Sequence, residues 1–503
     1  MVDQFTGCHD WDWVGIGLVK VGYSVEDTIV TKLNIRNHNT PNAWYGKRVL
    51  ILGAARQGLA LARFMVEHGA HVTVNDKQTA EKLMESQSAL ADYPIQWVLG
   101  SHPIELLDET EIVCISGGVP LSLPLVVEAR RRGIPLTNDT QIFLEQTPAK
   151  VVGITGSAGK TTTTTLVGRI AQAACSAGVM DKPYKKVWIG GNIGTPLIND
   201  LEKMSKEDLV ILELSSFQLE ILTRSPQIAA VLNITPNHLD RHGTMEVYIE
   251  AKAQILHYQQ DNDVAILNRE DIGSWGLKER VRGELNAFGK VYNDQYVGTF
   301  QDEGWINFWD GKKTTQLLPI GEIALRGEHN IQNVLAACAI ALSAGIPAWA
   351  CRIGVSGFKG VPHRLEFVRQ WHGADWYNDS IATAPERSMA AIRSFEEPLV
   401  LLLGGRDKNL PWQDFAKLAM ERARYLILFG EAAEKIERAF YEVGKPEMPP
   451  IARCRNLEEA VRAAAGVVQD GDVVLLSPGA TSFDEFRDFE ERGECFRKWV
   501  MNL

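Results

Sequence analysis

The architecture of this chain is signalled most clearly by the run Gly153-Ile154-Thr155-Gly156-Ser157-Ala158-Gly159-Lys160-Thr161-Thr162. An apolar pair precedes this run, and a helix-like segment at residues 163–172 follows it. A glycine-rich turn between a strand and a helix can point backbone N–H groups at phosphate oxygens, and the helix N-terminus adds partial positive charge. In such a loop Lys160 would reach the β- and γ-phosphates, and the hydroxyl of Thr161 would ligate Mg²⁺. We therefore expect ATP to bind at residues 156–162.

The spacing of this loop departs from the general phosphate-loop pattern. That pattern places a glycine five positions before Gly159, where this chain has Ile154. The loop is better described as G-x-T-G-x-x-G-K-T. An ordinary glycine turn that opens a helix is the alternative interpretation, and the ending GKTT disfavours it.

Composition limits the class of protein. The 503 residues predict about three domains, and the net charge of −11 gives no general basic surface for nucleic acid. The seven cysteines are scattered without a C-x-x-C pair, which is typical of reduced thiols in the cytoplasm. No apolar run is long enough to cross a membrane, and the N-terminus lacks the basic region of a secretory signal. We expect a cytoplasmic monomer that binds neither nucleic acid nor membrane.

The order of apparent strands and helices predicts an α/β protein with three domains in series. Residues 1–43 show no sustained period, and we expect a poorly ordered extension there. Residues 44–148 are expected to form a Rossmann-like domain, residues 149–358 a central P-loop ATPase-like domain, and residues 359–503 a second Rossmann-like domain.

The first domain begins with a β-α-β pattern. A strand at 49–52, a glycine turn at 53–58, a helix at 59–68 and a strand at 71–74 lead to Asp76. This order suggests a dinucleotide site, although the glycine pattern has lost its middle glycine. A further strand at 112–116 runs into Gly117-Gly118. Ligands of open α/β sheets bind along the edge where strands end, so we expect a ligand there.

In the central domain, apparent strands at 209–212, 229–232 and 263–267 end in polar residues. Glu213 is placed to hold Mg²⁺ against a nucleotide, unless it merely lies beside a helix capped by Ser215 or Ser216. His238 could ligate a metal through a neutral imidazole, or it could be structural. Lys252 lies in a helical segment, where its residue pattern alone indicates a surface lysine.

The third domain repeats the pattern with strands at 399–403, 425–429 and 473–476. Arg364, in V-P-H-R-L-E at 361–366, and Asp379, in N-D-S-I-A-T-A-P at 378–385, suit phosphate and ribose contacts. Lys408 and the segment S-P-G-A-T-S-F at 477–483 could hold a carboxylate. Solvated loops remain the alternative for each of these segments.

Together these segments resemble the Mur ligases, which are ATP-dependent amide-forming enzymes of peptidoglycan synthesis. The pieces that carry the resemblance are LELSSFQLE, GGNIG, NITPNHLDR, GEHN, VPHRLE, NDSIAT and LSPGATSFDEF, and they are similar to members that add D-glutamate to UDP-N-acetylmuramoyl-L-alanine. The resemblance covers residues 46 to 500, and the D-N-P-R signature of diaminopimelate-adding members is missing. It implies that ATP phosphorylates the substrate carboxylate and that an amine then displaces phosphate.

The resemblance also implies roles for individual residues. Lys160, Glu213, His238 and Lys252 would be catalytic, with Lys252 carbamylated by CO₂. Two Mg²⁺ ions would be held by Thr161, Glu213, His238 and Lys252. Besides the loop at 156–162, ATP would contact Asn268, Arg364 and Asp379. The UDP-linked substrate would contact Arg56, Gln57, Asp76, Lys77, Ser116, Gly118 and Asn192. The incoming glutamate would contact Thr383, Lys408, Ser482 and Phe483.

Two residues depart from the family pattern. Ala158 stands where the family usually has asparagine, and Ile381 stands where it usually has lysine. The second change removes a cation near the reacting groups, which Arg406 or another group would have to replace, and it leaves L-glutamate open as the amino acid. A P-loop ATPase that regulates without ligating and a dinucleotide-dependent oxidoreductase are the alternatives outside this class. The oxidoreductase leaves the GKTT loop without a role.

Overall fold

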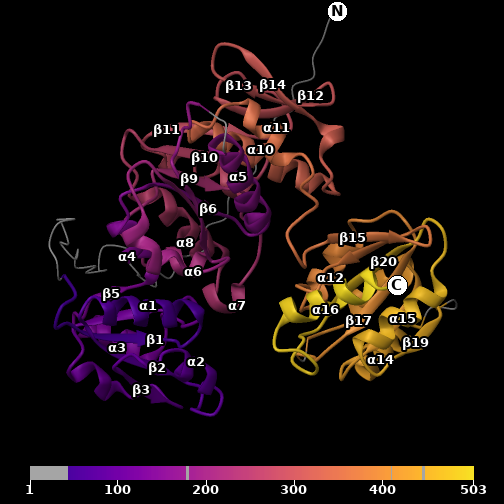
Figure 1. Ribbon diagram of the computed structural model, residues 1–503, viewed down its shortest axis with the longest axis horizontal. Coiled ribbons are helices and arrows are strands. Elements are labelled where there is room, and N and C mark those ends of the chain that lie inside the picture. Colours follow the sequence, from indigo (N-terminus) through magenta and orange to yellow (C-terminus); the bar gives the residue numbers. More distant parts are fainter. Residues whose placement is uncertain (1–42, 177–179, 409, 445–447) are drawn as a thin grey trace, which may run out of the picture.

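The computed structural model describes residues 43–176, 180–408, 410–444 and 448–503. The predicted extension at 1–43 therefore lies, except for Ala43, outside the described residues. Figure 1 shows three α/β bodies that follow one another along the chain, each built on its own sheet. The predicted fold class is confirmed.

The first body has a five-stranded, all-parallel sheet in the order β3-β2-β1-β4-β5. Its strands are β1 (Arg48–Leu52), β2 (His71–Asp76), β3 (Ile95–Leu99), β4 (Ile112–Ile115) and β5 (Leu136–Thr137). Its helices are α1 (Arg56–Glu67), α2 (Met84–Ala89), α3 (Pro124–Arg131) and α4 (Asp139–Gln146), with a 3-10 turn at Ile104–Asp108. Helix α1 begins three residues earlier than expected, so part of the predicted glycine turn is helical.

The central body has a nine-stranded sheet in the order β14-β13-β12-β11-β10-β9-β6-β8-β7, parallel from β7 to β12. Its strands are β6 (Lys150–Thr155), β7 (Val187–Gly191), β8 (Leu209–Glu213), β9 (Ile228–Val231), β10 (Val264–Asn268), β11 (Glu284–Phe288), β12 (Gly298–Asp302), β13 (Trp305–Trp309) and β14 (Thr314–Pro319). Its helices are α5 (Lys160–Cys175), α6 (Ser216–Leu219), α7 (Leu239–His242), α8 (Met245–His257), α9 (Ile272–Trp275), α10 (Glu328–Ser343) and α11 (Trp349–Val355). The antiparallel end formed by β12, β13 and β14 was not anticipated from the sequence.

The third body has a six-stranded sheet in the order β15-β16-β20-β17-β18-β19, parallel except for β15. Its strands are β15 (Glu366–Trp371), β16 (Ala374–Asn378), β17 (Leu399–Gly404), β18 (Ala423–Phe429), β19 (Ile451–Arg453) and β20 (Val473–Gly479). Its helices are α12 (Pro385–Ile392), α13 (Gln413–Arg422), α14 (Ala433–Val443), α15 (Leu457–Val467) and α16 (Phe489–Met501). In Figure 1, α12 lies on the side that faces the central body.

Apolar burial explains why the strands lie where the sequence predicts them. Val152 and Ile154 of β6 and the central residues of β17 are fully buried, because helices cover both faces of each parallel sheet. The strands that sequence analysis expected are therefore confirmed to within a few residues at their ends. In each sheet, the parallel strands end at the polar segments that were predicted to bind ligands.

The turn after β1 requires its glycines. A Cβ at Gly58 would lie 1.9 Å from the carbonyl oxygen of Gly53, which is backbone and cannot move aside, and Gly53 itself has a φ of +98°. The close approach of α1 to the end of β1 therefore depends on the absence of a side chain at 58.

We expect Gly58→Ala to lower the free energy of unfolding of the first body by about 1–3 kcal/mol, because the added methyl forces the turn and helix apart. Gly466→Ala is the matched control, since a Cβ there meets nothing within 4 Å and lies in the exposed part of α15. That control is expected to be neutral or stabilising. Denaturant unfolding followed by circular dichroism measures both, and equal stability of the two variants would contradict the packing argument.

Candidate active site

The predicted phosphate loop connects β6 to the N-terminus of α5. Gly159 caps the helix with a φ of 81°, and a Cβ on it would lie 2.3 Å from Oδ1 of Asn333. Glycine is therefore required on both conformational and steric grounds. Lys160 folds back over the loop, and its Nζ donates to the carbonyl of Gly156 at 2.8 Å.

The loop is fastened to the segment that follows β9. Asn233 accepts from the backbone N–H of Ala158 at 2.8 Å through Oδ1 and donates to its carbonyl at 3.1 Å through Nδ2. Ser157 Oγ donates to the Thr235 carbonyl at 2.9 Å and accepts from the Thr235 N–H at 3.0 Å. The backbone at 158 is thus held by a neighbouring side chain, and the loop keeps its shape with alanine at that position.

Lys252 lies on α8 directly beneath this loop. Its side chain is 1% exposed, and Nζ donates to the carbonyl of Gly156 at 3.0 Å and to Oγ1 of Thr155 at 3.5 Å. Burial, and after it the nearby charge of Lys160, lowers the pKa of Lys252 to about 6. The interpretation of Lys252 as a surface lysine is wrong. Nothing in its local residue pattern distinguished it, and only the family resemblance pointed to it.

Glu213, the last residue of β8, is 2% exposed. Its Oε1 accepts from Nδ2 of Asn192 at 2.9 Å, whereas Oε2 is buried without a hydrogen-bond partner among the described residues. The pKa of Lys160 is lowered, mainly by burial. The Glu213 carboxylate opposes this shift, and the charges of Arg364 and Arg387 add to it. A buried carboxylate oxygen without a donor suits a cation, so this position fits the predicted Mg²⁺.

His238 is less enclosed than Glu213. It adopts a left-handed φ of 55° before α7, is exposed, and sets its ring edge-on to Phe217 at 5.1 Å between centroids. The described ranges hold no group of three or more His, Cys, Asp or Glu side chains able to bind a metal. The four predicted metal residues therefore do not form a conventional protein cage, and phosphate oxygens would have to complete any site they make.

A buried polar triad lies beside His238. His242 places Nε2 3.0 Å from Oγ of Ser216 and Nδ1 3.1 Å from Oε1 of Glu220. Burial raises the pKa of Glu220 to about 7. This triad fixes α7 against α6, and no sequence pattern indicated the contact between His242 and Ser216.

The first body presents most of the predicted UDP-site residues along the ends of β1, β2 and β4. Ser116 Oγ donates to the carbonyl of Gly53 at 3.3 Å, and Arg56 Nη2 lies 3.5 Å from the carbonyl of Asn192. Asp76 accepts from the backbone N–H groups of Ala54 at 2.8 Å and Gln78 at 2.9 Å. Asp76 thus shapes the turn, in addition to any ligand contact.

The other predicted UDP-site residues are Gln57, Lys77 and Gly118, and they differ in burial and in their hydrogen bonds. Gln57 buries an Nε2 that has no partner within the described part of the chain, and Lys77 is exposed. Gly118 lies in a loop that the central body holds, because Arg241 donates to the carbonyl of Gly118 at 3.1 Å and to that of Val119 at 2.5 Å.

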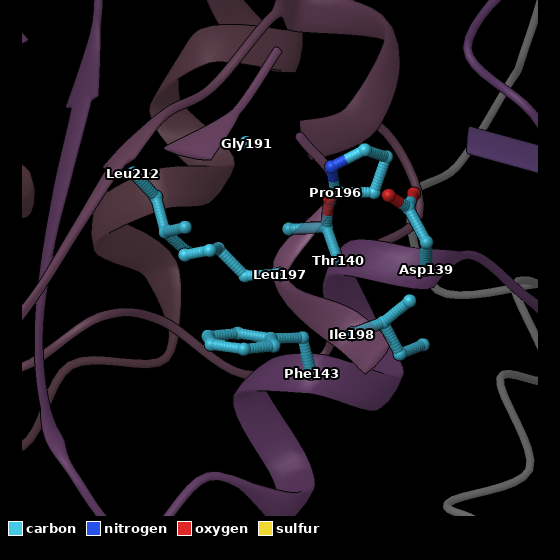
Figure 2. Close-up of a pocket in the computed structure, with 8 residues that line it drawn as sticks. All are labelled: Asp139, Thr140, Phe143, Gly191, Pro196, Leu197, Ile198 and Leu212. Atoms are coloured by element: carbon cyan, nitrogen blue, oxygen red, sulfur yellow. The ribbon is translucent and has the colours of Figure 1, made fainter. Parts of the chain in front are cut away.

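Figure 2 shows a small, mostly apolar pocket where α4 meets the segment after β7. Its residues are Asp139, Thr140, Phe143, Gly191, Pro196, Leu197, Ile198 and Leu212. Burial raises the pKa of Asp139 to about 6. None of the predicted site residues lines this pocket.

In the third body, Asp379 is buried at the end of β16. Its Oδ1 accepts from the N–H of Leu365 at 3.2 Å and its Oδ2 from Oγ of Ser477 at 2.8 Å. Burial raises the pKa of Asp379 to about 7. Arg364 is next to Leu365, whose N–H donates to Asp379, and its charge lowers that pKa. The two predicted nucleotide residues of this body are therefore brought together.

The loops that carry the predicted glutamate-binding residues are joined by Arg492 of α16. This arginine is fully buried, and it donates through Nε to Oγ of Ser380 at 3.0 Å, through Nη2 to the Ser380 carbonyl at 2.8 Å and through Nη1 to the Ala480 carbonyl at 3.1 Å. Sequence analysis missed this residue, because no local pattern marks an arginine whose partners are more than ten residues away.

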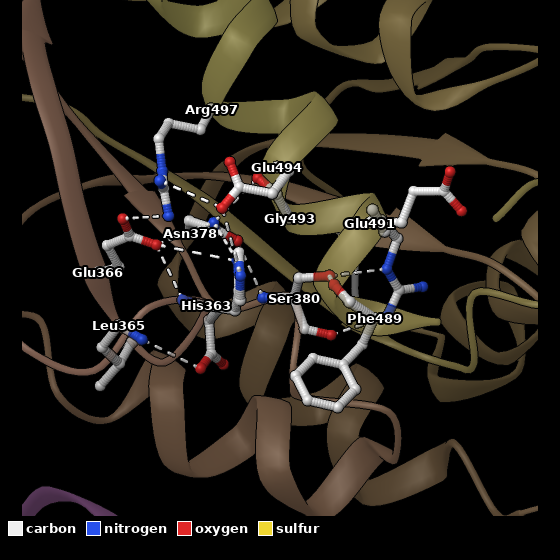
Figure 3. A network of polar contacts seen from close by, with 12 residues as sticks. His363, Leu365, Glu366, Asn378, Ser380, Phe489, Glu491, Gly493, Glu494 and Arg497 are labelled. Carbon is white, nitrogen blue, oxygen red and sulfur yellow. Dashed lines mark hydrogen bonds and ion pairs between the residues drawn. The ribbon is translucent and has the colours of Figure 1, made fainter. Parts of the chain in front are cut away.

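Figure 3 shows the polar network around this junction. Glu366 accepts from the N–H of His363 at 2.8 Å and pairs with Arg497 at 2.8 Å, while Asn378 Nδ2 lies 3.1 Å from Nδ1 of His363. These contacts hold the segment 361–366 against α16, and so fix Arg364.

The remaining predicted contacts are spread over three loops. Ser482 is buried and Thr383 half-buried, whereas Lys408 and Phe483 are exposed. Arg406, considered as a substitute for the missing lysine at 381, is instead held by both oxygens of Glu431, at 2.8 and 2.9 Å.

Asn268, the last predicted ATP contact, ends β10 in the central body. Its Nδ2 donates to the carbonyl of Leu232 at 3.0 Å and to Oε1 of Gln332 at 3.2 Å. The amide is therefore fixed at the carboxyl edge of the sheet.

The three bodies match three family models in the same order. The MurD-like N-terminal domain of Mur ligases matches residues 47–138, the Mur ligase middle domain residues 154–341, and the Mur ligase glutamate ligase domain residues 363–479. A phosphate loop in a central α/β domain between two further α/β domains defines an ATP-dependent ligase of this class, and the chain belongs to the Mur ligase family.

Within that family, similar proteins carry one name, UDP-N-acetylmuramoylalanine–D-glutamate ligase. The protein of Symbiobacterium thermophilum is 41% identical over 458 residues, which are 91% of this chain and 98% of that protein. The protein of Koribacter versatilis is 39% identical over 459 residues, with the same coverage.

Solved structures share the fold at lower identity. The UDP-N-acetylmuramate–alanine ligase of Thermotoga maritima superimposes with a TM-score of 0.53 at 18% identity, covering 91% of this chain and 99% of that one. The MurF ligase of Thermotoga maritima in complex with ADP gives a TM-score of 0.51 at 19% identity, covering 93% and 97%. In the described ranges, no helix combines the length and apolar character needed to cross a membrane.

We expect Arg492→Met to destabilise the third body, because the carbonyls of Ser380 and Ala480 lose their buried donor. The cost is about 1–3 kcal/mol for each carbonyl left unpaired. Denaturant unfolding measures it, with Arg487→Met as the control.

Arg487 lies on the surface and pairs with Glu491 at 3.3 Å, so its loss should cost about 0.5 kcal/mol at most. Equal stability of the Arg492→Met and Arg487→Met proteins would contradict the structural role assigned to Arg492.

Proposed function

We propose that this chain is an ATP-dependent ligase that adds D-glutamate to UDP-N-acetylmuramoyl-L-alanine, in peptidoglycan synthesis. The observation that carries the proposal is the pair of lysines on the carbonyl of Gly156, in a chain of which 91% is similar to a protein with that named activity. The product would serve wall growth, and so cell shape and division. We also propose that the chain works in the cytoplasm as a monomer, and that its domains span 44–148, 149–358 and 359–503.

The first chemical step would activate a carboxylate. A carboxylate oxygen of the UDP-linked substrate, held by the first body, attacks the γ-phosphorus of ATP, and the bond to ADP breaks. An acyl phosphate results, with a good leaving group in place of a poor one. Lys160 is placed to neutralise charge on the phosphates, because its ammonium is hydrogen-bonded to the Gly156 carbonyl of the loop itself.

The second step would form the amide. The amine of glutamate attacks the acyl carbon, a proton leaves the nitrogen, and the tetrahedral intermediate expels phosphate. Arg364, whose charge acts on Asp379, would stabilise the departing phosphate. Thr383, Lys408, Ser482 and Phe483 would position the amino acid.

Thr161, Glu213, His238 and Lys252 are the residues that would hold Mg²⁺, which supplies Lewis-acid polarisation of phosphate oxygens. Glu213 fits this task through its unpaired buried oxygen. Lys252 fits it only after conversion to a carbamate, because an ammonium repels a metal. A neutral amine attacks CO₂, a C–N bond forms and a proton leaves, and burial of Lys252 favours that neutral amine.

Two other functions remain to be tested. Ile381, in place of the usual lysine, favours considering the same ligation with L-glutamate, because the group that contacts the amino acid differs. A regulatory P-loop ATPase would use the same nucleotide loop without an acceptor.

Phosphate release, measured with and without UDP-N-acetylmuramoyl-L-alanine and a panel of D- and L-amino acids, tests the proposal. We expect turnover that requires both the UDP-linked substrate and D-glutamate. ATP turnover indifferent to both would refute the ligase and favour the regulatory ATPase. A preference for L-glutamate would refute only the choice of amino acid.

The state of Lys252 is tested by ¹³C NMR with labelled bicarbonate. The amine is neutral above its pKa of about 6 and charged below it, so the carbamate signal should be strong at pH 8 and disappear as the pH falls below 6. Lys252→Met should lack the signal at every pH.

Lys252→Ala is expected to be nearly inactive and to recover partly when short carboxylates are added, because they can occupy the space of the carbamate. An identical NMR signal in Lys252→Met, or near-normal activity of Lys252→Ala, would contradict this role.

A further inference from the structure

Arg326 joins the central body to the third. It lies just before α10 in the central body, yet its ion-pair partners belong to the third body. Nη2 donates to Oδ2 of Asp375 at 3.2 Å, and Nη1 donates to Oε1 of Glu397. The guanidinium carbon lies 5.3 Å from the ring centroid of Tyr377 and 5.6 Å from that of Phe395, within the range of a cation–π interaction. Between described residues, the ion pairs that link these two bodies are both made by Arg326.

The partners of Arg326 lie next to the proposed nucleotide site of the third body. Asp375 and Tyr377 belong to β16, and Asp379 follows that strand directly. Side chains alternate between the two faces of a strand, and residues 375, 377 and 379 are successive members of one alternation. The other two partners lie in the loop after α12, the helix that faces the central body in Figure 1. Arg326 therefore contacts the face of β16 that leads to Asp379.

The backbone of Arg326 is tied to the phosphate loop. Its carbonyl accepts from Nδ2 of Asn330 at 2.7 Å, and Oδ1 of Asn330 accepts from Nδ2 of Asn333 at 2.9 Å. Oδ1 of Asn333 accepts from Oγ1 of Thr163 at 3.4 Å and lies against Gly159 of the loop. Both asparagines and the threonine are buried. A short chain of buried hydrogen bonds thus fixes Arg326 relative to the phosphate loop, while its side chain holds the third body.

The rest of the contact between these two bodies leaves their relative orientation free to depend on Arg326. Two domains are expected to move relative to each other unless their interface is large and apolar. Within the described ranges, no residue belongs both to the buried apolar cluster around α5 and α10 and to either cluster of the third body. An arginine suits the task of holding them, because its planar fork reaches two carboxylates while its faces meet aromatic rings.

We propose that Arg326 is a positioning residue, which holds β16 of the third body beside the phosphate loop and so places Asp379 at the nucleotide during ligation. This role rests on the proposed ligase function, because that function is what requires groups of the third body at the nucleotide. Arg326 acts through β16 and not on a reacting atom.

Turnover and domain arrangement are measured on the same full-length variants. We expect Arg326→Gln to lower kcat about tenfold, because catalysis falls steeply when groups are misplaced. The affinity for UDP-N-acetylmuramoyl-L-alanine, measured by calorimetry, should stay unchanged, because the first body holds that substrate. Arg326→Lys, which keeps the charge but not the fork, should recover about threefold of the lost rate. Small-angle X-ray scattering should show a larger maximum dimension for Arg326→Gln than for the wild type.

The matched control is Arg352→Gln. Arg352 also pairs with a carboxylate, that of Glu322, but both residues belong to the central body, and Nε lies 2.8 Å from Oε2. This variant should match the wild type in turnover and in scattering. The backbone carbonyl that accepts from Asn330 is still present in Arg326→Gln, so the phosphate loop keeps that support.

An unchanged kcat or an unchanged scattering profile in Arg326→Gln would overturn the proposal. So would equal losses in Arg326→Gln and Arg326→Lys, equal losses in Arg326→Gln and Arg352→Gln, or a parallel loss of affinity for the UDP-linked substrate, which would indicate general damage. If the wild type does not ligate, the proposed function fails, and scattering alone decides on Arg326. A larger maximum dimension in Arg326→Gln then supports its hold on the third body, and an equal dimension refutes it.

Discussion

Two lysine side chains share one backbone acceptor, the carbonyl oxygen of Gly156, and the rest of the site is arranged around that contact. Two ammonium groups cannot both remain charged so close together in a buried place without opposing charge. Glu213 supplies an opposing charge beside Lys160, while Lys252 is buried and has its pKa lowered to about 6. Lys160 can therefore remain the cation that binds phosphates, whereas Lys252 can be the neutral amine that reacts with CO₂.

The sheets supply the constraint that brings the other groups to this point. Parallel strands expose their carboxyl ends along one edge, so Glu213 at the end of β8 and Asp379 directly after β16 each lie at an edge of their sheet. A ligand carboxylate held by the first body and a nucleotide held by the second would each lie at such an edge. The third body contributes arginines from outside its sheet, because Arg364 precedes β15 and Arg492 lies on α16.

Much of this arrangement could be predicted from the sequence. Apolar runs of strand length and the glycine loop gave the three-domain α/β fold, and Glu213 followed from its place after a strand. Lys252 could not be predicted from its residue pattern, because a lysine in an amphipathic helix has the same appearance whether buried or exposed. Arg492 was missed because its partners, Ser380 and Ala480, come from distant loops. The antiparallel strands β12, β13 and β14 were not predicted, because no ligand-binding motif marks their sequence.

Arg241 joins the first and central bodies through the carbonyls of Gly118 and Val119, and it lies three residues after His238 in the same segment. Any substrate that orders the loop at 117–119 therefore also restrains α7. Because such coupling is reciprocal, occupancy of the metal and phosphate side must strengthen or weaken substrate binding by the same factor. Through Arg241, the ligands of the two domains would then change each other's affinity by one factor, whichever of them binds first.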